Sequence, residues 1–144
     1  MMMEPSPSLR GCLVAVAVAL LGACGRSPEP PDPAQLATRS AAAAHLDRAR
    51  AALDAGRFAV ARVALDAAAE LTPRDQEIQR ARQRVEVLEA AADPEVVSDE
   101  AAARLTYAVE VLSDEPALAA ASAVVRARLA LLRGEGDAAL AELD

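Results

Sequence analysis

Aromatic residues are nearly missing from this 144-residue chain. Trp does not occur, and Phe58 and Tyr107 are the only residues of their kinds. Without large rings, a core has to be built from Leu, Val, Ile and Ala. Such small side chains suit closely packed helices better than a sheet. The composition therefore favours an all-α fold.

Side chains that carry nucleophilic or metal chemistry are equally scarce. The chain has one histidine, His45, two cysteines and no lysine. Nucleophile–base pairs and zinc sites both need several such groups together. Paired carboxylates such as Glu86 and Glu89 have the spacing of a solvated helix face, and the aromatic platforms of glycosidases are absent. We therefore expect no enzyme activity, no metal site, no cofactor and no small-molecule substrate.

Basic charge is in deficit, since the formal net charge is −7. Residues 25–85 hold ten Arg against eight acidic residues, whereas residues 86–144 hold four Arg against thirteen. A nucleic-acid-binding protein needs a basic face, so nucleic acid is not an expected partner. The more basic half could attract anionic lipid headgroups, or its arginines could simply form a solvated helix face.

One continuous apolar run is present, Cys12–Leu21. Its ten residues are well short of the roughly 20 that span a bilayer as a helix. Arg10 precedes the run and small residues follow it, which is the layout of a secretory signal. The run is therefore expected to be removed.

The four residues Leu21–Cys24 resemble the lipobox of bacterial lipoproteins: a large apolar residue, two small residues and cysteine. The resemblance implies that residues 1–23 are a lipoprotein signal peptide and that Cys24 is the lipidated first residue of the mature chain. Because Gly25 replaces the Asp that favours inner-membrane retention, it also implies the outer membrane, on its periplasmic face. The alternatives are an uncleaved N-terminal anchor and an ordinary signal cut after Ala23.

The segment after the lipobox is rich in proline. Four of the nine residues from 25 to 33 are proline, which favours extended, polyproline-like chain. We interpret residues 24–33 as the lipidated cysteine and a tether, and residues 34–144 as a helical domain.

Apolar residues recur at helical spacing throughout residues 34–144. Thr72 before Pro73, Asp93 before Pro94 and Glu115 before Pro116 have the pattern of helix starts. Glycines at 56, 134 and 136 suit the ends of helices and the turns between them. The predicted helices span 34–55, 57–71, 73–92, 97–113, 116–133 and 136–144. Short loops make consecutive helices antiparallel neighbours.

The predicted helix 57–71 is apolar on two faces, which indicates a helix sandwiched between neighbours. Phe58 and Leu65 are expected at the centre of the core. The second face consists of Val60, Ala64, Ala67 and Leu71.

The spacing of Gly56, Phe58, Ala61, Leu65, Ala68 and Pro73 resembles the second helix of a tetratricopeptide repeat. The resemblance implies antiparallel helix pairs stacked as a short TPR-like α-solenoid, whose concave face binds proteins or peptides. The first helix departs from the family, because His45 and Arg48 stand where a large aromatic and a Leu are expected. The repeat is also nearer 40 residues than the family's 34. A plain helical bundle is the alternative.

These features together predict a scaffold or interaction module of the bacterial envelope. It would be anchored to the membrane by lipid on Cys24 and would bind a protein or peptide partner. The alternative is a structural spacer or an envelope-stress lipoprotein with no specific peptide groove. The last predicted helix exposes Leu140 and Leu143, so the domain is expected either to belong to a longer array or to be covered at that end.

Overall fold

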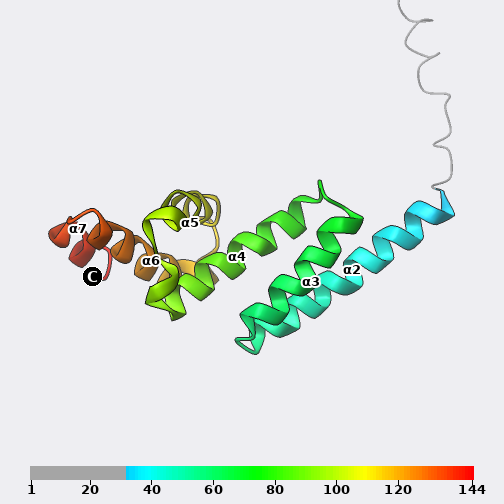
Figure 1. The fold of residues 1–144 in the computed structure, drawn as a ribbon, viewed down its shortest axis with the longest axis horizontal. Helices are drawn as coiled ribbons and strands as arrows, with labels where there is room; N and C mark the ends of the chain where they lie inside the picture. Colours follow the sequence, from blue (N-terminus) through cyan, green and yellow to red (C-terminus); the bar gives the residue numbers. More distant parts are fainter. Residues whose placement is uncertain (1–31) are drawn as a thin grey trace, which may run out of the picture. The chain divides into compact units, whose positions relative to one another are not determined.

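The computed structural model describes residues 32–144 of the chain, which Figure 1 shows as a series of helices. The expected signal peptide, the lipidation site Cys24 and the tether up to residue 31 lie outside the described residues.

All regular structure in the described part is helical, which confirms the predicted all-α class. The α-helices are α2 (Pro33–Asp54), α3 (Phe58–Leu71), α4 (Gln76–Ala92), α5 (Asp99–Val111), α6 (Ala119–Leu132) and α7 (Gly136–Ala141), with short 3-10 turns η1 (Pro94–Val96) and η2 (Pro116–Leu118). Figure 1 shows α2 and α3, and then α3 and α4, running antiparallel along one another. Packed antiparallel pairs are present, but no solenoid or TPR repeat is detected between residues 32 and 144.

The start of α4 differs from the sequence expectation. Thr72 does not cap this helix; its hydroxyl donates to the carbonyl of Ala68 at the end of α3 (3.2 Å). Asp75 is the N-cap instead, and its Oδ1 accepts from the amide of Glu77 (2.8 Å). Two candidate caps lay three residues apart, and Asp is as good a cap as Thr or better. The helix therefore starts three residues later than predicted.

Two of the three glycines form the predicted turns. Gly56 and Gly134 have φ values of 67° and 77°, in the left-handed region that residues with a Cβ avoid. At the first turn, the amide of Arg57 donates back to the carbonyl of Ala52 (2.8 Å), which is the hydrogen bond of a Schellman C-cap. Gly136 does not form a turn of this kind. It is the first residue of α7, and its φ is not positive.

The first cluster of the core joins α2, α3 and α4. Its members from α2 and α3 are alanines and two leucines, and α4 adds an isoleucine, an alanine and a valine: Ala42, Leu46, Ala49, Ala52, Ala61, Ala64, Leu65, Ala68, Ala69, Ile78, Ala81 and Val85. Of the two residues expected at the centre of the core, Leu65 is buried there and is 0% exposed. Phe58 is only partly buried and packs on the margin of this cluster. It is the first residue of α3, at the end of the helix rather than at its middle.

The predicted sandwich around α3 is only partly present. On the second face Ala64 is buried and Ala67 is half-buried, but Val60 and Leu71 are 45% and 38% exposed, and the neighbouring Val63 is 71% exposed. Both α2 and α4 pack on α3 in the first cluster, and His45 and Arg48 of α2 border this face, but neither helix covers it completely. An apolar pattern in the sequence marks a helix face that is suited to packing, but it does not show whether a neighbour covers that face.

The second cluster of the core joins α4 to α5 and α6. Its buried members come from the second half of α4, the η1 segment, α5, η2 and α6: Val87, Ala90, Val97, Ala101, Leu105, Ala108, Val109, Leu112, Leu118, Val125 and Leu129. In α6 Ser122, Val125 and Leu129 are buried, whereas Leu132, near the end of the helix, is 45% exposed. Because α4 contributes to both clusters, it is the element that connects them.

Ion pairs link neighbouring elements across the surface. They are Arg50–Glu77 between α2 and α4, Arg62–Glu89 and Arg82–Asp66 between α3 and α4, and Arg126–Glu142 at α6 and the residue after α7. Arg128 also donates to the backbone carbonyl of Ala90, which joins α6 to α4. Arginine suits these positions because its fork of donors can reach two acceptors at once.

Candidate protein-binding groove

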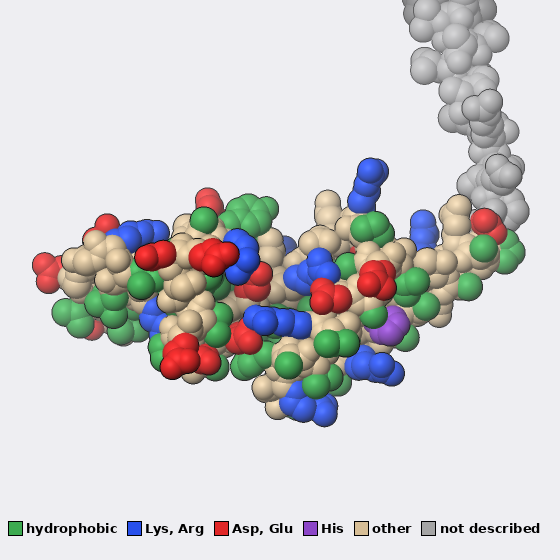
Figure 2. Space-filling view, in the orientation of Figure 1, with side chains coloured by type: hydrophobic (Ala, Val, Ile, Leu, Met, Phe, Trp, Pro, Cys, Tyr) green, Lys and Arg blue, Asp and Glu red, His purple; other side chains and the backbone are tan. Residues whose placement is uncertain are grey.

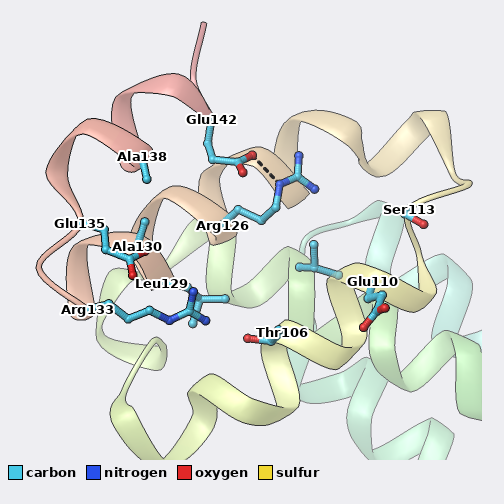
Figure 3. A pocket seen from close by; sticks show the side chains of 11 residues that line it. Thr106, Glu110, Ser113, Arg126, Leu129, Ala130, Arg133, Glu135, Ala138 and Glu142 are labelled. Carbon is cyan, nitrogen blue, oxygen red and sulfur yellow. Dashed lines mark hydrogen bonds and ion pairs between the residues drawn. The ribbon is translucent and has the colours of Figure 1, made fainter.

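A groove of about 400 Å³ lies where α5, α6 and α7 meet. Figure 3 shows its lining side chains, which come from all three helices and the α6–α7 turn. The floor is formed by Val109, Leu129 and Ala130, which are 4%, 4% and 6% exposed. Exposed residues form most of the rim: Thr106, Glu110, Ser113, Arg133, Glu135 and Ala138.

The turn at Gly134 positions α7 as one wall of the groove. Because this glycine adopts a positive φ, the chain reverses after α6 and α7 packs back on it. The seam between the two helices is lined by Ala127, Ala130 and Ala139, whose small side chains let the backbones approach. Arg126 Nε donates to Glu142 Oε2 at 2.5 Å, and this ion pair, drawn dashed in Figure 3, joins the end of α7 to α6.

Both signs of charge lie at the rim. Glu110, Arg133 and Glu135 form no ion pair among the residues described, whereas Arg126 and Glu142 pair with each other. Ser113 and Thr106 add hydroxyl groups, although the Thr106 hydroxyl already donates to the carbonyl of Ala102 (2.8 Å). An apolar floor with a mixed polar rim can hold an aliphatic side chain and bond the polar groups around it.

Strong charge pairing occurs elsewhere, beside η2. Glu115 Oε1 accepts from Arg80 Nε (2.5 Å), and its other oxygen accepts from Arg84 Nε (2.7 Å). The hydrogen bond from Arg84, followed by that from Arg80, holds the pKa of the Glu115 carboxyl below its usual range, against an opposing effect of burial. The Arg80 pKa is raised, chiefly by the hydrogen bond to Glu115. This cluster ties α4 to the α5–α6 connection and is not part of the groove.

The residues predicted from the repeat motif lie in α3 and at its two ends, not at the α5–α7 groove. Ala61, Leu65 and Ala68 are fully buried inside the first cluster. Gly56 and Pro73 are exposed and bound α3 at its two ends. His45, half-buried on α2, lies in a different, apolar groove beside Val60 and Val63.

Sequence reasoning missed the α5–α7 groove. Its residues are spread over 106–142 and share no motif, so no local signal marks them. The nearest hint was the glycine pair around residue 135, which marks a turn.

The part of the chain from residue 32 onward shows no grouping of three or more His, Cys, Asp or Glu side chains that could hold a metal ion. Nor is any helix in that part both long and apolar enough to cross a membrane.

Comparisons with protein-family models, with curated proteins and with solved structures gave no match for this chain.

Proposed function

We propose that this protein is a membrane-anchored scaffold of the bacterial envelope, and that its α5–α7 groove binds a protein or peptide partner. The observation that carries the proposal is the groove itself, with a buried apolar floor and an exposed rim of both charges. A volume of about 400 Å³ accepts one or two side chains of a peptide. The rim then fixes the direction of the peptide through polar contacts.

The anchor is the second part of the proposal. The lipobox-like Leu21–Cys24 supports removal of residues 1–23 and lipidation of Cys24. Each buried CH₂ of an acyl chain contributes about 0.8 kcal/mol, so two or three chains hold the protein on the membrane. Gly25 after the cysteine supports the periplasmic face of the outer membrane.

The finer assignment of the fold, a short TPR-like α-solenoid, belongs to the same proposal. It is supported by the Gly56–Pro73 spacing and by the burial of Ala61, Leu65 and Ala68 between antiparallel helices. We propose no catalytic role, in keeping with the scarcity of histidine, cysteine and lysine in the sequence.

Site-specific crosslinking tests the groove in the full-length chain. A photoreactive residue at Ser113 is expected to capture a discrete envelope protein, and Ala138→Arg, which places a long side chain on the groove wall, is expected to reduce that capture at least about tenfold. The matched control is Ala141→Arg, an exposed alanine of α7 outside the groove, which should leave capture unchanged. Equal losses in both variants, or no discrete product, would favour a passive spacer.

Fractionation tests the anchor separately. Cys24→Ser is expected to shift the protein from the membrane to the soluble fraction or to leave the precursor uncut. A variant that is cut normally and still fractionates with the membrane would rule out the lipid anchor.

A further inference from the structure

Two exposed apolar patches lie on different elements of the domain. The α2–α3 patch is formed by Val60 and Val63, which are 45% and 71% exposed, beside His45 and Arg48 in an apolar groove of about 380 Å³. The α7 patch is formed by Leu140 and Leu143, which are 67% and 59% exposed. Neither leucine lines the α5–α7 groove, so the α7 patch is a separate surface.

The unpaired charges on α2 and α3 are mainly basic and those around α7 are mainly acidic, although Asp54 and Glu70 in the first region and Arg133 in the second have the minority sign. Arg39, Arg48 and Arg57 on and between α2 and α3 form no ion pair among residues 32–144. At the other patch, Glu135, Asp137 and Asp144 likewise form none. Figure 2 shows hydrophobic side chains beside charged ones in both regions, with both signs of charge present in each.

The charges decide which surfaces can meet. Two α7 patches facing each other would bring acidic groups together, and two α2–α3 patches would bring arginines together; both arrangements are repulsive. An α7 patch against an α2–α3 patch buries leucines against valines and places carboxylates beside unpaired guanidinium groups.

We propose that the α2–α3 patch of one copy of this chain binds the α7 patch of a second copy, head to tail. Such a contact joins two different surfaces, so each copy keeps one free patch of each kind. A contact of this type adds further copies unless its rotation closes a ring. The protein therefore forms short chains of copies, and raised salt weakens the charge contribution to the contact. This inference does not depend on a partner occupying the groove.

Paired cysteines test the contact in cells that produce the full-length chain. Val63→Cys and Leu140→Cys are introduced into separately tagged copies, and oxidation is expected to give a disulfide-linked dimer only when both are present. One chain carrying both substitutions is expected to give a ladder of oligomers. Tyr107→Cys, at an exposed position of α5, is the matched control and should pair with neither.

Charge reversal provides the second measurement. Arg48→Glu in the Val63→Cys copy should lower the yield of dimer by up to about fivefold, since an exposed ion pair is worth up to about 1 kcal/mol. Asp137→Arg in the Leu140→Cys copy should restore it. The proposal is overturned if Leu140→Cys links mainly to itself, if Val63→Cys links to a different protein, or if the mixed dimer does not form.

Discussion

At the scale of single residues, the most constrained charge in the described part of the chain is the carboxylate of Glu115. Its side chain is 15% exposed and accepts from two arginines of α4, although each arginine side chain is more than a third exposed. Partial exposure of the donors weakens the interaction through solvent screening. The carboxylate nevertheless ties the connection between α5 and α6 to a helix of the first cluster.

We predict that Glu115→Gln destabilises the domain by about 1 kcal/mol at pH 7, because two hydrogen bonds lose their charge. The folded pKa of Glu115 is lowered, so its contribution is present above the unfolded pKa of about 4.3 and is lost as the pH falls through the folded value. Urea denaturation at pH 7 and pH 3 checks this, and the difference between the two proteins should shrink at pH 3. The control is Glu70→Gln, an exposed residue of α3. A difference that stays constant with pH would contradict the assignment.

At the scale of elements, Gly134 and Gly136 at the α6–α7 turn are the same residue type in different backbone conformations. A Cβ at Gly134 or at Gly136 would meet no atom within 4 Å. The two differ only in conformation, because Gly134 has a φ of 77° and Gly136 is helical.

We predict that Gly134→Ala costs about 1–2 kcal/mol, the strain of an alanine in the left-handed region. Gly136→Ala, its matched control, should be neutral or stabilising by up to about 1 kcal/mol, because alanine restricts the unfolded chain and favours the helix. Thermal melts of the two variants check the sign. Equal effects would show that the α6–α7 turn does not need a positive φ.

The position of each helix could be predicted from the sequence, because apolar spacing and turn residues are local signals. The pairs Asp93–Pro94 and Glu115–Pro116, expected at helix starts, open the 3-10 turns η1 and η2, and the α-helices α5 and α6 begin a few residues later. The cap at Asp75 was missed because Thr72 offered a competing signal nearby. The incompletely covered face of α3 and the α5–α7 groove could not be predicted, because both depend on where other helices pack. The motif residues Ala61, Leu65 and Ala68 are in the core, but the sequence did not connect them to any groove.

At the scale of the whole described domain, α4 determines whether the two clusters behave as one unit. Ile78, Ala81 and Val85 belong to the first cluster, and Val87 and Ala90 belong to the second. One continuous helix thus contributes to both, with no break between Val85 and Val87.

We predict a single unfolding transition. Leu65→Ala removes a fully buried side chain and should cost about 2–5 kcal/mol. Tyr107, on α5, is the chain's only tyrosine and there is no tryptophan, so its fluorescence reports on the helices of the second cluster. We expect the unfolding transitions measured by this fluorescence and by the helical circular dichroism signal to shift together. Val63→Ala, at a 71% exposed position, should change the free energy of unfolding measured by either signal by no more than about 0.5 kcal/mol. A tyrosine transition that does not move with Leu65→Ala would show that the clusters unfold independently.

The alanine seam between α6 and α7 has a consequence for how long the proposed partner would stay in the groove. Ala127, Ala130 and Ala139 bury little more than three methyl groups, on the order of 2 kcal/mol, and the Arg126–Glu142 pair adds little because it is partly exposed. α7 should therefore undock by local unfolding while the other helices remain folded. Since α7 is one wall of the groove, each undocking event opens a route of escape. The dissociation rate of the partner would then follow the opening rate of this short helix.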